Sequence, residues 1–195
     1  MTIANQRLTL EEYLDYDDDT NIRYELVDGA LVAMPAESTE NTQIAMFLVS
    51  VLLQMGIPYY RLGIKQQIAV SSKRATARDP DLIVHSEASA QAISGRRQAL
   101  LQADMPTPML VVEIVSSSDT DKKSRDRDYL EKRSEYAARG IAEYWIIDPI
   151  ANLIIVGTLT GQVYDTLEFR GSDAISSRAF PIMQLTAEQV LKAGL

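Results

Sequence analysis

One acidic residue lies inside an apolar run that favours a β-strand. The run is Leu110–Val115, and the acid within it is Glu113. Short runs rich in β-branched residues are typical of buried strands, where an unpaired carboxylate is strongly unfavourable. We therefore expect Glu113 to be neutralised by a metal ion, by a lysine or arginine, or by a proton taken up through a raised pKa.

Two further acids occupy comparable positions. Asp81 follows Pro80 at the start of the apolar run Leu82–His85, and Glu25 lies between Tyr24 and Leu26. If the strands of Asp81 and Glu113 are neighbours, their carboxylates converge and repel each other unless a divalent cation bridges them. The chain has no cysteine and one histidine, so a metal would be held by oxygen ligands, which favours Mg²⁺ or Mn²⁺.

Composition places the chain among globular proteins. Its 195 residues, 46% hydrophobic and 24% charged, allow one domain with a substantial core. No apolar run reaches the roughly 20 residues of a membrane span, and the first residues lack an apolar signal core. The lack of cysteines fits a reducing compartment, so we expect a cytoplasmic protein without a membrane partner.

The net charge of −8 belongs to the N-terminal fifth of the chain. Residues 1–40 hold ten acids against Arg7 and Arg23, which leaves 17 acids and 17 bases elsewhere. This uneven distribution argues only weakly against nucleic-acid binding, because local basic patches matter more than the total charge. Three basic clusters are candidates for phosphate contacts or are simply solvated: Arg61, Lys65, Lys73, Arg74 and Arg78; Arg96 and Arg97; Lys122, Lys123, Arg125 and Arg127.

Local patterns predict alternating helices and strands. Helices are expected at 9–16, 38–55, 97–102, 124–139 and from 186 onward. Strands are expected at 24–27, 30–34, 59–62, 65–70, 82–85, 110–115, 144–147, 153–158 and 162–169, with a polar connection at 71–78. We find no internal repeat or linker, and predict one mixed α/β domain over residues 1–195.

Four motifs carry a family resemblance. They are Tyr24–Gly29 (YELVDG), Asp79–Leu82 (DPDL), Val111–Ser116 (VVEIVS) and Gly140–Pro149 (GIAEYWIIDP). In this order and spacing they resemble the Uma2 family, which belongs to the PD-(D/E)XK restriction-endonuclease-like superfamily. The resemblance implies an α/β fold of the mixed α+β type, a restriction-endonuclease-like core whose central mixed β-sheet is flanked by helices.

The resemblance also implies roles for individual residues. Asp81 and Glu113 match the motif acids and would bind the metal, with Glu25 as an additional acidic ligand. The superfamily places a lysine two residues after the second acid, where this chain has Val115. In this family the lysine appears on the following helix, and Lys132 occupies that place.

Helical spacing is consistent with this substitution. Asp128, Lys132 and Tyr136 recur every four residues and would share one helix face. The long lysine stem can reach a neighbouring strand end, where the ammonium could position water or neutralise a phosphate.

Each assignment has a structural alternative. Glu113 could pair only with an arginine or with Lys132, Asp81 could be a turn acid, and Glu25 could face solvent. Asp128 and Lys132 could form a surface pair. We expect His85 to be structural and Trp145 to be core, while Gln66 could orient water or phosphate.

The sequence thus predicts a Mg²⁺-dependent endonuclease that hydrolyses DNA phosphodiester bonds through Glu25, Asp81, Glu113 and Lys132, with Mn²⁺ as a possible substitute. The alternatives are a catalytically inactive nuclease-fold module that binds nucleic acid or protein, and a protein-binding factor with an acidic face at residues 11–40. A homodimer is expected because cutting two strands requires two sites.

Overall fold

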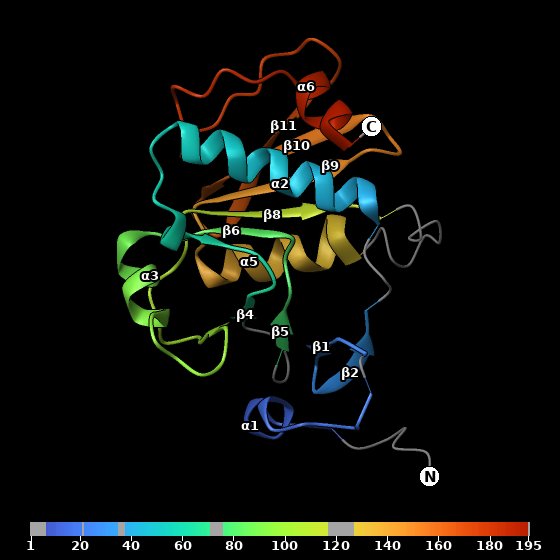
Figure 1. Ribbon diagram of the computed structural model, residues 1–195, viewed down its shortest axis with the longest axis vertical. Coiled ribbons are helices and arrows are strands. Elements are labelled where there is room, and N and C mark those ends of the chain that lie inside the picture. The colour runs from blue at the N-terminus through green and yellow to red at the C-terminus, as the bar shows by residue number, and fades with distance from the viewer. Residues whose placement is uncertain (1–6, 21, 35–37, 71–75, 117–126, 195) are drawn as a thin grey trace.

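The computed structural model describes residues 7–20, 22–34, 38–70, 76–116 and 127–194; the side chains of Arg127 and Asp128 lie outside this description. Two mixed β-sheets form its framework (Figure 1). The small sheet has the order β2-β1-β5-β4-β7, and the large sheet has the order β11-β10-β9-β8-β6-β3. Each sheet is mixed because one pair of strands is parallel, β4 with β7 and β8 with β9.

The small sheet contains β1 (Tyr24–Val27), β2 (Ala30–Ala33), β4 (Gln67–Val70), β5 (Thr76–Arg78) and β7 (Leu100–Leu101). The large sheet contains β3 (Leu62–Gly63), β6 (Leu82–Val84), β8 (Leu110–Ile114), β9 (Glu143–Asp148), β10 (Leu153–Thr160) and β11 (Val163–Phe169). The helices are α1 (Leu10–Leu14), α2 (Thr39–Gln54), α3 (Glu87–Ile93), α5 (Arg133–Arg139) and α6 (Ala187–Leu191), with 3₁₀ turns η1 (Tyr59–Arg61) and η3 (Lys192–Gly194) and a π-helical segment η2 (Arg127–Lys132).

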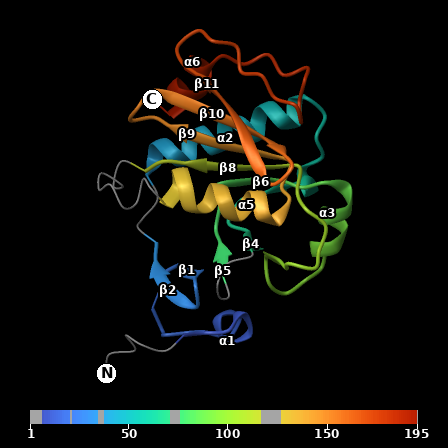
Figure 2. The same ribbon diagram turned by 180° about the vertical axis from the view of Figure 1, so that it is seen from behind.

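Two helices cover opposite faces of the large sheet. Helix α2 lies in front of the sheet in Figure 1, and α5 lies in front of it in the reverse view of Figure 2. Along β8, Leu110 and Val112 pack in the core layer of α2, whereas Val111 packs in the core layer of α5. Because side chains alternate along a strand, Glu113 points to the α5 side.

The predicted hairpin and the predicted long helix are confirmed. Strands β1 and β2 meet at Asp28 and Gly29, whose φ values of 49° and 76° form a type I′ turn. Helix α2 begins after Ser38, whose side chain accepts a hydrogen bond from the Asn41 amide, and ends before Gly56 at φ +87°.

Two local predictions are wrong. Residues 59–61 form a 3₁₀ turn after Pro58 instead of a strand; Tyr59 is 79% exposed, so its β preference finds no sheet face to cover. The helix expected at 97–102 is not formed, because Leu100–Leu101 is a strand; a helix lies instead at Glu87–Ile93, where Ser86 caps it.

The polar connection expected at 71–78 includes a buried strand, β5. Its residues Thr76 and Arg78 are almost fully buried because their polar groups are bonded: Thr76 accepts from the Asp28 amide, and Arg78 forms ion pairs. Polarity alone therefore predicted exposure incorrectly here. Within the described ranges, no helix is long and apolar enough to cross a membrane.

Candidate active site

Glu113 and Asp81 lie opposite each other on neighbouring strands. Leu82 pairs with Val112 in the antiparallel ladder, so the next position along pairs Asp81 with Glu113 on the α5 face. Glu113 is 4% exposed, and Asp81 Oδ2 accepts a 2.6 Å hydrogen bond from the Ile114 amide. This backbone contact fixes the Asp81 carboxylate at the strand end beside Glu113. The strands of Asp81 and Glu113 are therefore neighbours, which was the condition for their carboxylates to converge.

A lysine and a tyrosine from the helical segment reach Glu113. Lys132 Nζ lies 2.8 Å from Glu113 Oε2, and the Tyr136 hydroxyl donates to Glu113 Oε1 at 2.7 Å. Burial, and then the charge of Glu113, raise the pKa of Tyr136 well above its ordinary value. Tyr136 therefore stays a hydrogen-bond donor, and both oxygens of Glu113 are held in place.

Lys132 is the last residue of the π-helical segment that precedes α5. The wider π turn changes the angular spacing between the residues before and after it, and such turns recur at functional sites. Tyr129, from the same segment, donates to Asp148 Oδ2 at 2.7 Å. The segment thus contacts β9 through Tyr129 while Lys132 contacts β8.

Glu25 joins the cluster from the small sheet. It is 2% exposed, so the alternative in which it faces solvent is wrong. Its Oε1 accepts from the Asp79 amide at 3.1 Å and lies 3.7 Å from Lys132 Nζ, while its Oε2 lies 3.2 Å from Arg78. Lys132 therefore lies between Glu25 of one sheet and Glu113 of the other.

Arg78 links Glu25 of this cluster to helix α5. Its fully buried guanidinium contacts Glu25 and makes two hydrogen bonds to Glu135 of α5, at 2.7 and 2.9 Å. Burial lowers the pKa of Arg78, but the neighbouring Glu135 and Glu25 carboxylates raise it more, so the group remains charged. The suggestion that Arg78 belongs to a phosphate-contacting basic cluster is therefore wrong, because its donors are directed to these buried acids.

Sequence reasoning missed the parts played by Arg78, Asp79 and Tyr136. Asp79 is buried and pairs with Arg23; burial raises the pKa of its carboxyl, and the Arg23 charge opposes that rise. A usable signal was present for Tyr136, which lies four residues after Lys132 on the same helix face. For Arg78 the hint was its position directly before the Asp79–Asp81 motif.

Other predicted candidates are placed as follows. His85 is buried between Ser89 and Gln66, at 3.0 and 2.7 Å, and burial followed by the Arg61 charge lowers its pKa to about 4. Both His85 and Gln66 thus contact each other instead of the carboxylate cluster. Trp145 is core, as expected. Lys73, Arg74, Lys122, Lys123, Arg125 and the side chains of Arg127 and Asp128 lie outside the described residues.

The acids offer a limited donor set for a metal. In the part of the chain that the structure describes, no group of three or more His, Cys, Asp or Glu side chains is arranged to hold an ion. Mg²⁺ commonly uses one or two protein carboxylates and completes its shell with water and phosphate oxygens. The Asp81 and Glu113 carboxylates, on the same face of adjacent strands, fit that kind of site.

A family model described as "Uma2: Putative restriction endonuclease" matches residues 10–188 of the chain. The chain belongs to the Uma2 family. The match includes all the motif residues and the two sheets that bring them together.

The Uma2 chain also shares its fold with a solved structure. A crystal structure of "a putative nuclease belonging to DUF820" from Anabaena variabilis superposes with a TM-score of 0.71 at 18% identity, covering 96% of this chain and 99% of that one. The agreement over almost the full length of both chains shows a shared fold and confirms the predicted mixed α+β architecture of sheet flanked by helices. No curated protein matched the sequence.

Proposed function

We propose that this Uma2 protein is a Mg²⁺-dependent endonuclease that hydrolyses DNA phosphodiester bonds, with Mn²⁺ able to substitute. The single observation that best supports the proposal is the position of Lys132, 2.8 Å from Glu113 and 3.7 Å from Glu25 in a buried cluster that borders Asp81. Acid and base groups brought together in a buried cluster are characteristic of catalytic sites, although structural ion-pair networks share this arrangement. Membership in the family described as "Putative restriction endonuclease" supports the same reaction class.

In this proposal Asp81 and Glu113 hold the ion, and Glu25 is an additional acid of the site. A bound divalent ion would lower the pKa of water and stabilise charge on the phosphate. In this proposal the Lys132 ammonium, held between the Glu25 and Glu113 carboxylates, would neutralise charge on the phosphate or position the attacking water from that place. Tyr136 holds the second Glu113 oxygen and so positions that carboxylate.

Nicking of supercoiled plasmid tests the proposal. We expect the wild type to nick DNA with Mg²⁺ or Mn²⁺ and to lose this activity in EDTA, and we expect Asp81→Ala and Glu113→Ala to be inactive. Glu168→Ala is the matched control, since Glu168 is an exposed acid on β11. Equal nicking by all of these proteins would refute the assignment and indicate a contaminating nuclease.

A non-catalytic module that binds nucleic acid or a protein partner is the second candidate. One observation favours it: both oxygens of Glu113 already have partners, Lys132 and Tyr136. Calorimetric titration with Mn²⁺ separates the two candidates. Heat of binding that disappears in Asp81→Ala supports the enzyme, whereas DNA binding without any Mn²⁺ binding supports the module.

A homodimer belongs to the same proposal. Cleavage of both strands of a duplex by this site requires two copies or two binding events. Sedimentation equilibrium of the purified protein, with and without a duplex, measures the stoichiometry directly.

A further inference from the structure

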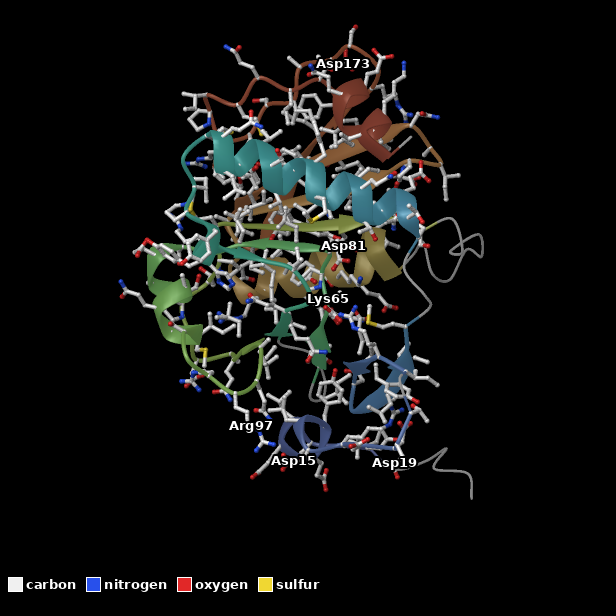
Figure 3. All side chains as sticks on the ribbon, in the orientation of Figure 1. Asp15, Asp19, Lys65, Asp81, Arg97 and Asp173 are labelled. Atoms are coloured by element: carbon white, nitrogen blue, oxygen red, sulfur yellow. The ribbon has the colours of Figure 1, made fainter. Side chains whose placement is uncertain are left out.

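A pocket of about 350 Å³ lies beside the carboxylate cluster. It is formed by the end of α1, the start of β1 and the β4–β7 side of the small sheet. Figure 3 labels Lys65, one of its lining residues, between Asp81 and helix α1 in that view. Its volume is at the lower end of the range for small-ligand sites.

Asp79 connects the pocket to the candidate active site. The residue lines the pocket, and its backbone amide donates to Glu25 Oε1 at 3.1 Å. Asp81 is two residues further along the chain, a span of at most about 7 Å. A ligand in the pocket is therefore a close neighbour of any phosphate held at Asp81 and Glu113.

Aromatic side chains form one wall of the pocket. Tyr16 and Tyr24 meet edge to face with ring centroids 5.9 Å apart, and both hydroxyls contact Asp18. Both rings remain partly exposed. Fixed, accessible aromatic rings are the groups on which unpaired bases stack, whatever their sequence.

Two cations lie at the rim. The Arg23 side chain is 44% exposed while it pairs with Asp79, and Lys65 is exposed with φ +56°. A lysine in this left-handed conformation is uncommon, and within the described residues Lys65 forms no ion pair. The acidic run Asp17–Asp19 adjoins the same wall. Because these acids repel further phosphates, the pocket suits one nucleotide with one or two phosphates better than a long stretch of nucleic-acid backbone.

We infer that this pocket binds one unpaired nucleotide of the nucleic-acid strand, with its base against Tyr16 and Tyr24 and its phosphate at Arg23 and Lys65. The inference rests on the proposed function, because it assigns the next nucleotide of the same substrate. A base within a duplex is stacked between its neighbours and cannot offer its face to the tyrosines. The substrate class that follows is single-stranded, frayed or locally unpaired DNA.

Fluorescence anisotropy tests this inference without cleavage. The probe is a fluorescein-labelled single strand of DNA in EDTA, compared with the same sequence as a blunt duplex. We expect tighter binding of the single strand, and about five- to a hundredfold weaker binding by Tyr16→Ala. Tyr16→Phe, which keeps the ring, and Tyr59→Ala, which removes an exposed tyrosine outside the pocket, should bind like the wild type.

A second variant keeps the test decisive if Tyr16→Ala fails to fold. Lys65→Gln should reduce the slope of log affinity against log salt by about 0.7, the value for one phosphate contact on a single strand. Unchanged affinity in Tyr16→Ala, or an unchanged salt slope in Lys65→Gln, overturns the inference. If plasmid nicking depends on Asp81 while Tyr16→Ala and Lys65→Gln bind DNA like the wild type, only the inference fails. If DNA binding depends on Tyr16 but no nicking depends on Asp81, the proposed function fails.

Discussion

Lys132 reaches Glu113 from a helical segment, and under the proposed function it would take the place of the superfamily's strand lysine. The superfamily position two residues after Glu113 is Val115, which is 1% exposed and packs in the α5 core layer. A lysine at Val115 would have to displace that packing, whereas a lysine on the helix reaches Glu113 by its stem alone. The position of Lys132 places an ammonium beside the Glu113 carboxylate and leaves the strand apolar.

Lys132→Met should strongly reduce nicking and also destabilise the protein. Activity should fall by about 10²- to 10³-fold, and stability should fall by about 3–5 kcal/mol because Glu113 would remain buried with its cation removed. Urea unfolding and plasmid nicking measure the two effects. Lys192→Met, which removes a lysine with a 64% exposed side chain, is the control.

The double variant Lys132→Met with Glu113→Gln separates stability from catalysis. Neutralising Glu113 removes the unpaired charge, so most of the lost stability should return. Nicking should remain strongly reduced. A double variant as unstable as Lys132→Met would contradict the ion-pair explanation.

His85 makes stability depend on pH. Its pKa is lowered to about 4 in the folded protein and is near 6.5 in the unfolded chain, so the unfolded chain binds the proton first as the pH falls. Stability is therefore full above about pH 6.5 and declines between about pH 6.5 and 4, by roughly 3 kcal/mol for this group. Urea unfolding at pH 7 and 4.5 should show a smaller decline in His85→Asn than in the wild type; equal declines would argue against His85 as the cause.

At the scale of elements, strong local signals predicted the fold well. The capping box of α1, the Asp28–Gly29 turn and the apolar spacing of α2 each depend on neighbours in sequence, and all are present. Strand β5 and the two-residue strand β7 were not predictable in this way. Their residues become strands because β1 and β4 offer partners from distant parts of the chain.

In the candidate site, too, local sequence signals identify some residues, whereas contacts between distant segments were not predictable. The acids could be identified because a carboxylate in an apolar run is unusual, and the lysine because of the family resemblance. The contacts of Arg78 with Glu25 and Glu135 join three separate segments, so no local pattern predicts them. The metal and the catalytic roles remain predictions.

Gly140 directly follows α5, the helix that begins after Lys132 and carries Tyr136. Its φ is +82°, and an added Cβ would meet only Thr107 Cγ2 at 4.0 Å, so strain rather than collision opposes a larger residue. Gly140→Ala should lower the free energy of unfolding by about 1–2 kcal/mol, and Gly140→Asn should lower it less because asparagine tolerates this conformation. Thermal or urea unfolding checks the order; equal loss in both variants would contradict the backbone explanation.

At the scale of the whole molecule, Glu143 holds the C-terminal segment against the large sheet. This 1% exposed carboxylate accepts from Trp145 Nε1, Ser177 Oγ and the amides of Arg178 and Ala179, at 2.6–2.9 Å. The segment it holds passes over the end of the fold that carries α6 (Figure 1). These four donors stabilise the buried carboxylate, and among the described residues no basic side chain forms an ion pair with it.

Glu143→Gln should weaken this connection strongly. The glutamine NH₂ group would face at least one of the four hydrogen-bond donors and could not accept from it. The free energy of unfolding should therefore fall by about 3 kcal/mol. Urea unfolding followed by the fluorescence of Trp145, the only tryptophan, measures it, with Glu168→Gln as the exposed control. Nicking at a temperature where the variant is folded should be unchanged, since Glu143 lies outside the carboxylate cluster; a loss of nicking there would show that the segment influences the site.

Arg78 has an evolutionary consequence. Its buried guanidinium pairs with Glu25 of the small sheet and with Glu135 of the helix over the large sheet, so loss of the arginine would deprive both glutamates of this cation. In homologous sequences the three positions should therefore covary, and those that replace the arginine should have neutralised both glutamates. Homologues in which Glu25 is retained as an acid of the site should therefore also retain the arginine.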